Sequence, residues 1–377
     1  MDFLPIKDYI EKVLIAEKGV PGCDVIIKKE HETLFRFSTG HSDYERRVPV
    51  TDNDIYLMFS CTKPITCTAA LQLVEKGEIT LDTPVKEILP EFSNVYIMND
   101  GVKKKPEKTM NIRHLFTMSA GFDYNLNSEA INETIKNNPK AGTMEIVNAI
   151  SKTPLYFEPG EKFKYSLCHD VLAVVVEAAS GMKFSEYLEK NIFNPLGMKD
   201  TGFIVPENKK ERLAALYRCY ERGKYEPIEQ KNTFQLTENY ESGGAGLYST
   251  VDDYILFADA MANEGMGLTG NKILNKETID LMRTEQLSEY SVDSSFTCAA
   301  GPGYGYGLGV RTLIDKSGGQ RSPLGEFGWD GAAGSYVMID PENKLSIFFA
   351  MHVMSWPMLI GCGHAPIRDL TYDILEL

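Results

Sequence analysis

The sequence lacks the features that mark several large classes of protein. No run of about 18 apolar residues is present, so the sequence predicts no membrane-spanning helix. Lys and Arg number 39 against 53 Asp and Glu, and the net charge of −14 argues against nucleic acids or anionic membranes as partners. The seven cysteines include no C-x-x-C pair, and the N-terminal residues do not resemble a signal peptide. We therefore expect a cytoplasmic protein with free thiols.

Several motifs of well-known catalytic sites are also missing. The sequence contains no G-x-S-x-G nucleophile turn, no H-E-x-x-H, no phosphate-binding P-loop and no G-x-G-x-x-G. Cys362 and His364 could ligate a metal, but no further ligands follow at a suitable spacing. We expect neither a metal nor a cofactor, and the sequence carries no indication of an oligomeric state.

What the sequence does contain is an ordered series of helix and strand signals at its two ends. They predict a helix over 6–18, strands over 24–29, 33–39, 305–314, 334–339 and 345–353, and a helix near 367–375. The long segment between these ends mixes helical runs with loops punctuated by Pro and Gly.

Strands from both ends of the chain can share one antiparallel sheet. This arrangement predicts a discontinuous α/β domain, residues 1–85 and 236–377, with a mainly helical domain, residues 86–235, inserted into it. The crevice between two such domains is a usual place for a small-molecule site.

A serine followed three residues later by a lysine occurs twice, at Ser60–Lys63 and at Ser180–Lys183. Residues three apart on a helix are neighbours, so the lysine amine can accept the serine proton if burial lowers its pKa. Ser180 ends an apolar helix that a glycine breaks, whereas Ser60 stands just before a helix with a proline in its first turn. There the Ser60 amide is free to bind an oxyanion, although an ordinary N-cap serine is the alternative interpretation.

The run around Ser60, MFSCTKPITCTAALQLVEKGEITLDTPV (58–85), resembles the catalytic-helix region of the serine β-lactamase and penicillin-recognising superfamily. The likeness continues, in the family's order, through 112–122, 157–203, 243–265 and 304–310. It implies an α/β plus all-α, β-lactamase/transpeptidase-like fold. In that fold an antiparallel sheet is flanked by N- and C-terminal helices, and Ser60 lies between the two domains.

The second motif of that family departs from its best-known form. Class C β-lactamases and D-Ala-D-Ala peptidases carry Tyr-x-Asn, and the matching place here reads Tyr165-Ser166-Leu167. Tyr165 keeps the phenol that could share a proton with Lys63 and protonate the leaving group. Leu167 cannot make the hydrogen bonds of the missing Asn.

The third motif, Lys-Thr-Gly or His-Thr-Gly in those enzymes, is replaced by Trp329-Asp330-Gly331. This triplet lacks the cation that binds the carboxylate of β-lactams and D-Ala peptides. Its Trp329, like the Tyr-Ser-x form of the second motif, resembles family VIII carboxylesterases of the same superfamily. By position, Trp329, Asp330 and Gly331 would contact the substrate, and the Ala332 amide would complete an oxyanion hole with that of Ser60. A large core aromatic is the alternative interpretation of Trp329.

The resemblance implies a serine hydrolase that forms an acyl-enzyme on a small-molecule ester or amide. Ser60 would attack the carbonyl while Lys63, with Tyr165, takes the proton, and water would then release the acyl group. Esters of small or medium acyl chains are the expected substrates. Hydrolysis of β-lactams or D-amino-acid peptides, and acyl transfer to an alcohol or amine, would use the same residues and stay open as alternatives. A non-catalytic binding protein with this fold is a remote alternative.

Overall fold

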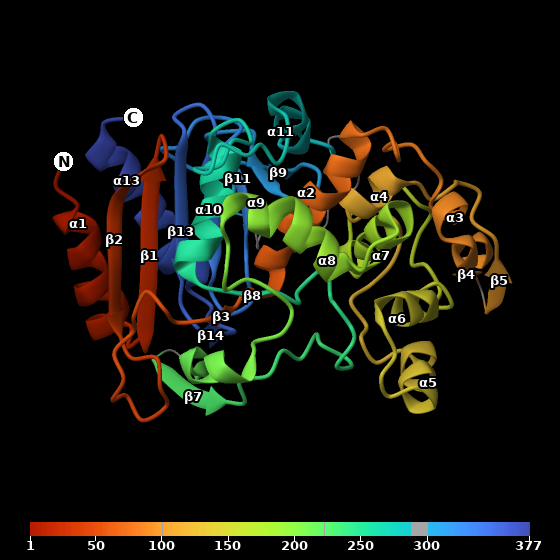
Figure 1. Ribbon diagram of the computed structural model, residues 1–377, viewed down its shortest axis with the longest axis horizontal. Coiled ribbons are helices and arrows are strands. Elements are labelled where there is room, and N and C mark those ends of the chain that lie inside the picture. Colours follow the sequence, from red (N-terminus) through yellow and green to blue (C-terminus); the bar gives the residue numbers. More distant parts are fainter. Residues whose placement is uncertain (100, 222, 288–300) are drawn as a thin grey trace.

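The largest sheet is built from both ends of the chain. The computed structural model describes residues 1–99, 101–221, 223–287 and 301–377. Within these residues a seven-stranded antiparallel sheet has the order β2-β1-β13-β12-β11-β10-β9 (Figure 1). Its strands are β1 Gly22–Lys29, β2 Glu32–Gly40, β9 Tyr304–Tyr306, β10 Arg311–Leu313, β11 Phe327–Asp330, β12 Tyr336–Asp340 and β13 Leu345–Ala350. The prediction that N-terminal and C-terminal strands share one antiparallel sheet is confirmed.

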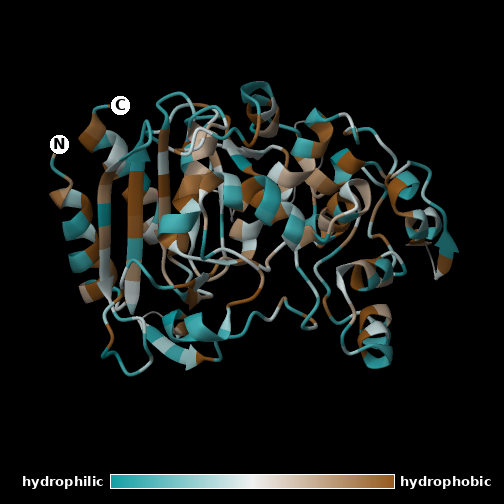
Figure 2. Ribbon diagram, in the orientation of Figure 1, coloured by the Kyte–Doolittle hydropathy of each residue, from teal (hydrophilic) through white to brown (hydrophobic). Residues whose placement is uncertain are grey.

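Helices cover both faces of this sheet, as the alternation of side chains along its strands requires. On one face Val25 of β1 and Phe349 of β13 pack with residues of the N- and C-terminal helices in a single apolar cluster. On the other face Phe348 stacks on Tyr254 of helix α10 (Val251–Ala262), with ring centroids 4.2 Å apart. Figure 2 shows the hydrophobic colour along β1, a strand buried between these two layers.

Among the described residues, helices occur along the whole length of the chain. The helices are α1 Leu4–Tyr9, α2 Thr62–Glu75, α3 Val85–Ile88, α4 Ile112–Phe116, α5 Glu129–Asn137, α6 Thr143–Ile150, α7 Cys168–Ser180, α8 Phe184–Leu188, α9 Asn194–Leu196, α10 Val251–Ala262, α11 Lys276–Met282 and α13 Ala365–Leu375. A π-helical stretch, Ile10–Glu17, continues α1. Helices α2 and α7 pack on each other in the centre of the molecule and are buried on nearly all sides. The domain boundaries at 85/86 and 235/236 stay a prediction.

One strand assignment made from the sequence is wrong. The single strand expected over 305–314 is a hairpin, because Gly309 adopts a φ of +85° and the chain reverses between β9 and β10. The mainly helical middle segment also contains strands: a hairpin of β4 Ile97–Asn99 with β5 Val102–Lys104, and β6 Leu216–Glu221 with β7 Lys224–Ile228. Strand β6 pairs in parallel with β14 Val353–Met354. That partner lies far along the chain, so no local pattern indicates it.

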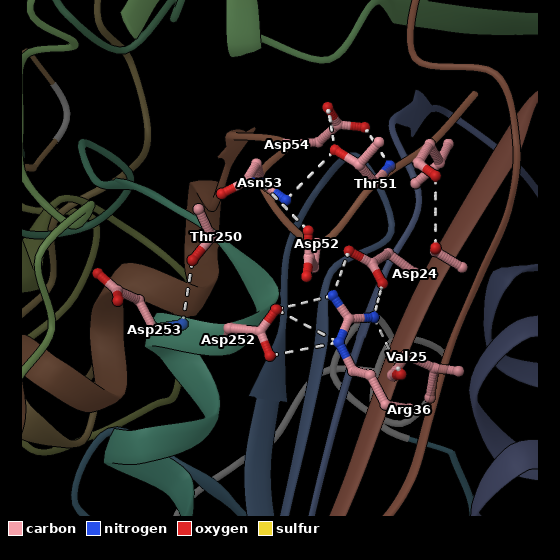
Figure 3. A network of polar contacts seen from close by, with 12 residues as sticks. Asp24, Val25, Arg36, Thr51, Asp52, Asn53, Asp54, Thr250, Asp252 and Asp253 are labelled. Carbon is pink, nitrogen blue, oxygen red and sulfur yellow. Dashed lines mark hydrogen bonds and ion pairs between the residues drawn. The ribbon is translucent and has the colours of Figure 1, made fainter. Parts of the chain in front are cut away.

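A partly buried polar network ties the N-terminal hairpin to α10 (Figure 3). Arg36 of β2 donates hydrogen bonds to Asp24 of β1 and to Asp252 in the first turn of α10. Thr250 caps the same helix, because its hydroxyl accepts a hydrogen bond from the Asp253 amide at 3.0 Å. The network fixes α10 against the sheet, and α10 in turn packs behind the chain that carries Ser60.

None of the described helices is both long and apolar enough to cross a lipid bilayer. The six cysteines among the described residues are free, and Cys298 lies outside those residues. The cytoplasmic location stays a prediction.

Candidate active site

Ser60 lies on a tight turn that leads directly into α2. The turn is a 3₁₀ helix over Phe59–Cys61, and Thr62 begins α2. Phe59 has a φ of +45°, a backbone conformation that costs free energy for a residue with a side chain and is typical of functional turns. The turn is held by the short antiparallel pair of β3 Tyr56–Leu57 with β8 Tyr248–Ser249. Ser60 therefore stands at the N-terminal end of a buried helix, as the sequence predicted.

Lys63 follows one turn later and is fully buried. Its Nζ lies 3.2 Å from Ser60 Oγ and 2.6 Å from the Gly244 carbonyl oxygen. Burial lowers the pKa of the Lys63 amine to about 8, and the negative charge of Asp170 opposes this decrease. An amine with this pKa is partly neutral near pH 7 and can accept a proton.

Tyr165 reaches Ser60 from the loop before α7. Two backbone hydrogen bonds hold this loop: Lys164 N–H donates to the Met118 carbonyl at 2.9 Å, and Leu167 N–H donates to the Asp123 carbonyl at 3.0 Å. The Tyr165 hydroxyl donates to Ser60 Oγ at 2.6 Å. Burial raises the pKa of the Tyr165 phenol, so this hydroxyl keeps its proton at neutral pH.

Tyr124 is a member of this cluster that the sequence analysis missed. Its ring stacks on that of Tyr165 at 5.5 Å, and its hydroxyl lies 3.4 Å from Lys63 Nζ. Tyr124 comes two residues after the 112–122 run that carries the family resemblance, and this proximity is the one signal that could have found it.

Trp329 joins the cluster from β11 on the opposite side of Tyr165. Its ring stacks on Tyr165 at 5.8 Å, and its Nε1–H donates to the Tyr165 hydroxyl at 3.3 Å. The next residue, Asp330, lies 3.6 Å from Arg311, and burial raises the pKa of its carboxyl to about 6. Trp329 is buried in the main apolar core and also contacts Tyr165. Substrate binding by Trp329, Asp330 and Gly331 stays a prediction.

Gly331 brings the end of β11 against the Ser60 turn. A Cβ at this position would lie 2.4 Å from the Met58 carbonyl oxygen, so only glycine permits the approach. Ser335 fastens the same turn by donating from its hydroxyl to the Met58 carbonyl at 3.0 Å. Ala332 follows Gly331 in the turn between β11 and β12, and it is exposed. The pairing of its amide with that of Ser60 as an oxyanion hole stays a prediction.

The remaining motif positions lie away from this centre. Leu167 is buried in the main apolar core and precedes α7, so it fills space where the family's Asn would make hydrogen bonds. Ser180 donates to the Val176 carbonyl at 2.6 Å, and Lys183 forms an ion pair with Glu241. The side chains of the second S-x-x-K pair therefore have structural partners.

Comparison with known proteins places this centre in a family. A family model described as Beta-lactamase matches residues 8–359. The chain belongs to the Beta-lactamase family. The order of elements described above is that of the family's fold, which combines an α/β part with helices and a mainly antiparallel sheet.

Relatives within this family differ in their named activities. The chain is 30% identical over 390 residues to Esterase EstB of Burkholderia gladioli, covering 95% of this chain and 92% of the esterase. It is 27% identical over 377 residues to a putative D-alanyl-D-alanine carboxypeptidase of Escherichia coli K12, covering 93% of this chain and 80% of that protein. The solved structure of EstCE1, a hydrolase with promiscuous acyltransferase activity, has a TM-score of 0.80 at 25% identity and covers 97% of both chains. These relatives support a hydrolase that acts on small molecules.

Proposed function

We propose that this protein is a serine carboxylesterase that forms an acyl-enzyme on Ser60. The observation that carries the proposal is the convergence of two groups on Ser60 Oγ, with Lys63 Nζ at 3.2 Å and the Tyr165 hydroxyl at 2.6 Å. One of these groups has a pKa lowered toward neutrality, and the other keeps its proton. Such a pair can remove a proton from the nucleophile and return one to the leaving group.

The first half-reaction transfers the acyl group to the enzyme. The neutral Lys63 amine takes the Ser60 hydroxyl proton as Oγ bonds to the ester carbonyl carbon. The amides of Ser60 and Ala332 stabilise the resulting oxyanion, and each such donor contributes on the order of 10²–10³-fold to the rate. The tetrahedral intermediate collapses, and the leaving alkoxide takes a proton from the Tyr165 hydroxyl. Protonated Lys63 then returns a proton to Tyr165.

The second half-reaction releases the acyl group. Water gives a proton to Lys63 as its oxygen attacks the acyl carbon. The bond from that carbon to Ser60 Oγ breaks, and Oγ recovers its proton through Tyr165 and Lys63. The products are a carboxylic acid and the regenerated hydroxyl, so the step needs no other reactant.

An ester is favoured over a β-lactam or a D-amino-acid peptide because of Trp329. At the position where class C enzymes and D-Ala-D-Ala peptidases have a cation, this chain has an indole that donates to the Tyr165 hydroxyl. The nearby cation Arg311 is buried, faces Asp330 and donates to the Val337 carbonyl. A substrate without a carboxylate fits these surroundings best, and the similarity to Esterase EstB supports this choice.

The test compares Ser60→Ala with Ser180→Ala, a matched change in the second S-x-x-K pair. Wild type and Ser180→Ala should hydrolyse p-nitrophenyl butyrate faster than a chromogenic cephalosporin, and Ser60→Ala should hydrolyse neither. Intact-mass analysis should show an acyl adduct that maps to Ser60. Faster cephalosporin turnover would reverse the substrate order, and normal esterase activity in Ser60→Ala would overturn the mechanism. Added alcohols or amines, followed by product analysis, distinguish hydrolysis from acyl transfer. A folded wild type that is never acylated would identify a binding protein.

A further inference from the structure

A buried carboxylate, that of Asp170, lies near the candidate base, Lys63. Asp170, in the first turn of α7, has no exposed surface. Its Oδ1 accepts two hydrogen bonds, from the Tyr240 hydroxyl at 2.7 Å and from the Ser242 hydroxyl at 2.6 Å. A carboxylate in the protein interior is costly unless it is hydrogen-bonded or balanced by a positive charge. No side chain among the described residues hydrogen-bonds to its second oxygen, Oδ2.

The turn that begins at Ser242 connects this carboxylate to Lys63. The Ser242 hydroxyl accepts a hydrogen bond from the Ala245 amide at 3.0 Å, which closes the turn. The Gly244 carbonyl, on the same turn, accepts from Lys63 Nζ at 2.6 Å. The turn is also fastened to α2 by Thr66, whose hydroxyl donates to the Gly243 carbonyl at 2.7 Å. Asp170 therefore holds, through Ser242, the backbone that positions the Lys63 amine.

Gly244 allows three polar groups to meet at one place. A Cβ on this glycine would lie 2.7 Å from Asp170 Oδ2, 3.0 Å from the Tyr124 hydroxyl and 3.5 Å from Lys63 Nζ. The oxygen that lacks a side-chain partner and the amine thus border the same space beside Gly244. Any side chain at this position would push these groups apart.

The charges around the amine show what Asp170 contributes. Burial lowers the pKa of Lys63, and among the surrounding groups Asp170 opposes it most, followed by Cys67, Cys61 and Asp330. Burial in turn raises the pKa of Asp170, while Ser242, Tyr240, the Lys63 charge and the Gly244 amide oppose that rise. Tyr124 and Tyr165 also have pKa values raised by burial and stay neutral. Burial, together with the Lys63 charge, lowers the pKa of His169 to about 3, so it is neutral as well.

We propose that Asp170 is a positioning residue for the acyl-transfer reaction. Through Ser242 it holds the Gly244 carbonyl against Lys63, and its charge stabilises the ammonium that forms when Lys63 holds the Ser60 proton. This inference rests on the proposed function, since it assigns Asp170 to the support of the same base. It explains why an anion is retained in the interior at this point, with one oxygen beside the same glycine as the amine.

The test is the pH dependence of kcat/KM for Asp170→Asn, a change that keeps an acceptor oxygen and removes the charge. In the wild type, activity should rise through a pKa of about 8 as Lys63 loses its proton. Without the anion the ammonium is less stable, so the acidic limb should move to lower pH by about 1–3 units. The plateau should fall at least about tenfold, because a less basic amine is a weaker base.

Asp340→Asn is the matched control. Asp340 is also fully buried and accepts a hydrogen bond from a tyrosine, Tyr372, at 2.7 Å, but it lies at the end of β12 away from Lys63. This variant should lose stability and keep the wild-type pH profile. A folded Asp170→Asn with the wild-type acidic limb and plateau would overturn the proposal.

Ser242→Ala keeps the inference testable if Asp170→Asn does not fold. This variant retains the carboxylate and removes the link to the Gly244 turn. Its kcat should fall about tenfold with little change in KM, because the base is displaced while the surroundings of the substrate remain. Unchanged kcat would overturn the proposal. Failure of the proposed function is distinguishable, since it would appear first as a wild type without Ser60-dependent esterase activity.

Discussion

Two clusters in this molecule each combine a cation with a fully buried aspartate, Asp24 or Asp170, and they differ in how the cation is paired. Arg36 donates to both oxygens of Asp24 and to Asp252 (Figure 3). In the described part of the chain, the Lys63 amine has three hydrogen-bond partners, all neutral oxygens, and the carboxylate of Asp170 only borders the same space beside Gly244. In one cluster the cation is neutralised directly by carboxylates, and in the other the cation can lose and regain a proton.

The ionisation of the two cations follows from this difference in pairing. Burial would lower the pKa of Arg36, but its hydrogen bonds to Asp24 and Asp252 raise the pKa above its ordinary value. Burial lowers the pKa of Lys63 to about 8, because nearby charges only partly offset the desolvation. A guanidinium is also a permanent charge with a fixed donor geometry, whereas an ammonium shifts its pKa readily. The first cluster suits stability and the second suits proton transfer.

Replacing each cation by methionine is the sharpest way to test this comparison, and Lys63→Met should have the larger effect. The variant keeps the length of the side chain and removes the base, so kcat/KM for p-nitrophenyl butyrate should fall by about 10²–10⁴-fold. Its free energy of unfolding, from urea titration, should stay within about 1 kcal/mol of the wild type, because Asp170 keeps its hydrogen bonds from Tyr240 and Ser242 and is not hydrogen-bonded to Lys63 directly. Activity near the wild-type value would contradict the role of Lys63.

Arg36→Met should show the opposite pattern. It leaves the fully buried carboxylate of Asp24 without its cation, and loss of one partner of a buried pair costs about 3–5 kcal/mol of unfolding free energy. At a temperature where the variant remains folded, kcat/KM should be unchanged. Asp252→Asn is the graded control, since the Asp252 side chain is 45% exposed and its loss should cost about 1 kcal/mol or less. Equal losses in both variants would show that the cluster is not centred on Asp24.

The same contrast explains how much the sequence could predict. Ser60 and Lys63 are one helical turn apart, and Tyr165 and Trp329 each stand in a short contiguous motif, so local spacing and family resemblance were sufficient to propose them. Asp170 meets Tyr240 across a separation of 70 residues, and Lys63 meets Gly244 across 181. No local periodicity encodes such contacts.

The strands likewise differ in how far a local pattern predicts them. Strands β1, β12 and β13 of the main sheet alternate between two apolar layers and could be found from their pattern, whereas β11 was not among the strands expected from it. Strand β6 pairs with the adjacent strand β7 and, in parallel, with β14. In the second pairing Val353 follows Tyr217 by 136 residues, so this partner leaves no local signal. The turn of Gly309 divides a run that otherwise has the period of one strand.

The smallest expected effect tests whether the Arg36 cluster acts as one unit with α10. Thr250→Ala removes the hydroxyl that caps α10, and this should cost about 1 kcal/mol of unfolding free energy with kcat/KM unchanged. Because the capped turn carries Asp252 to Arg36, the cap and the cluster share a partner. In the Arg36→Met background, the cost of Thr250→Ala should therefore be smaller by about 0.5 kcal/mol or more. In the Lys63→Met background it should match the wild type within about 0.5 kcal/mol. Equal costs in all three backgrounds would mean that the helix cap and the Arg36 cluster stabilise the fold independently.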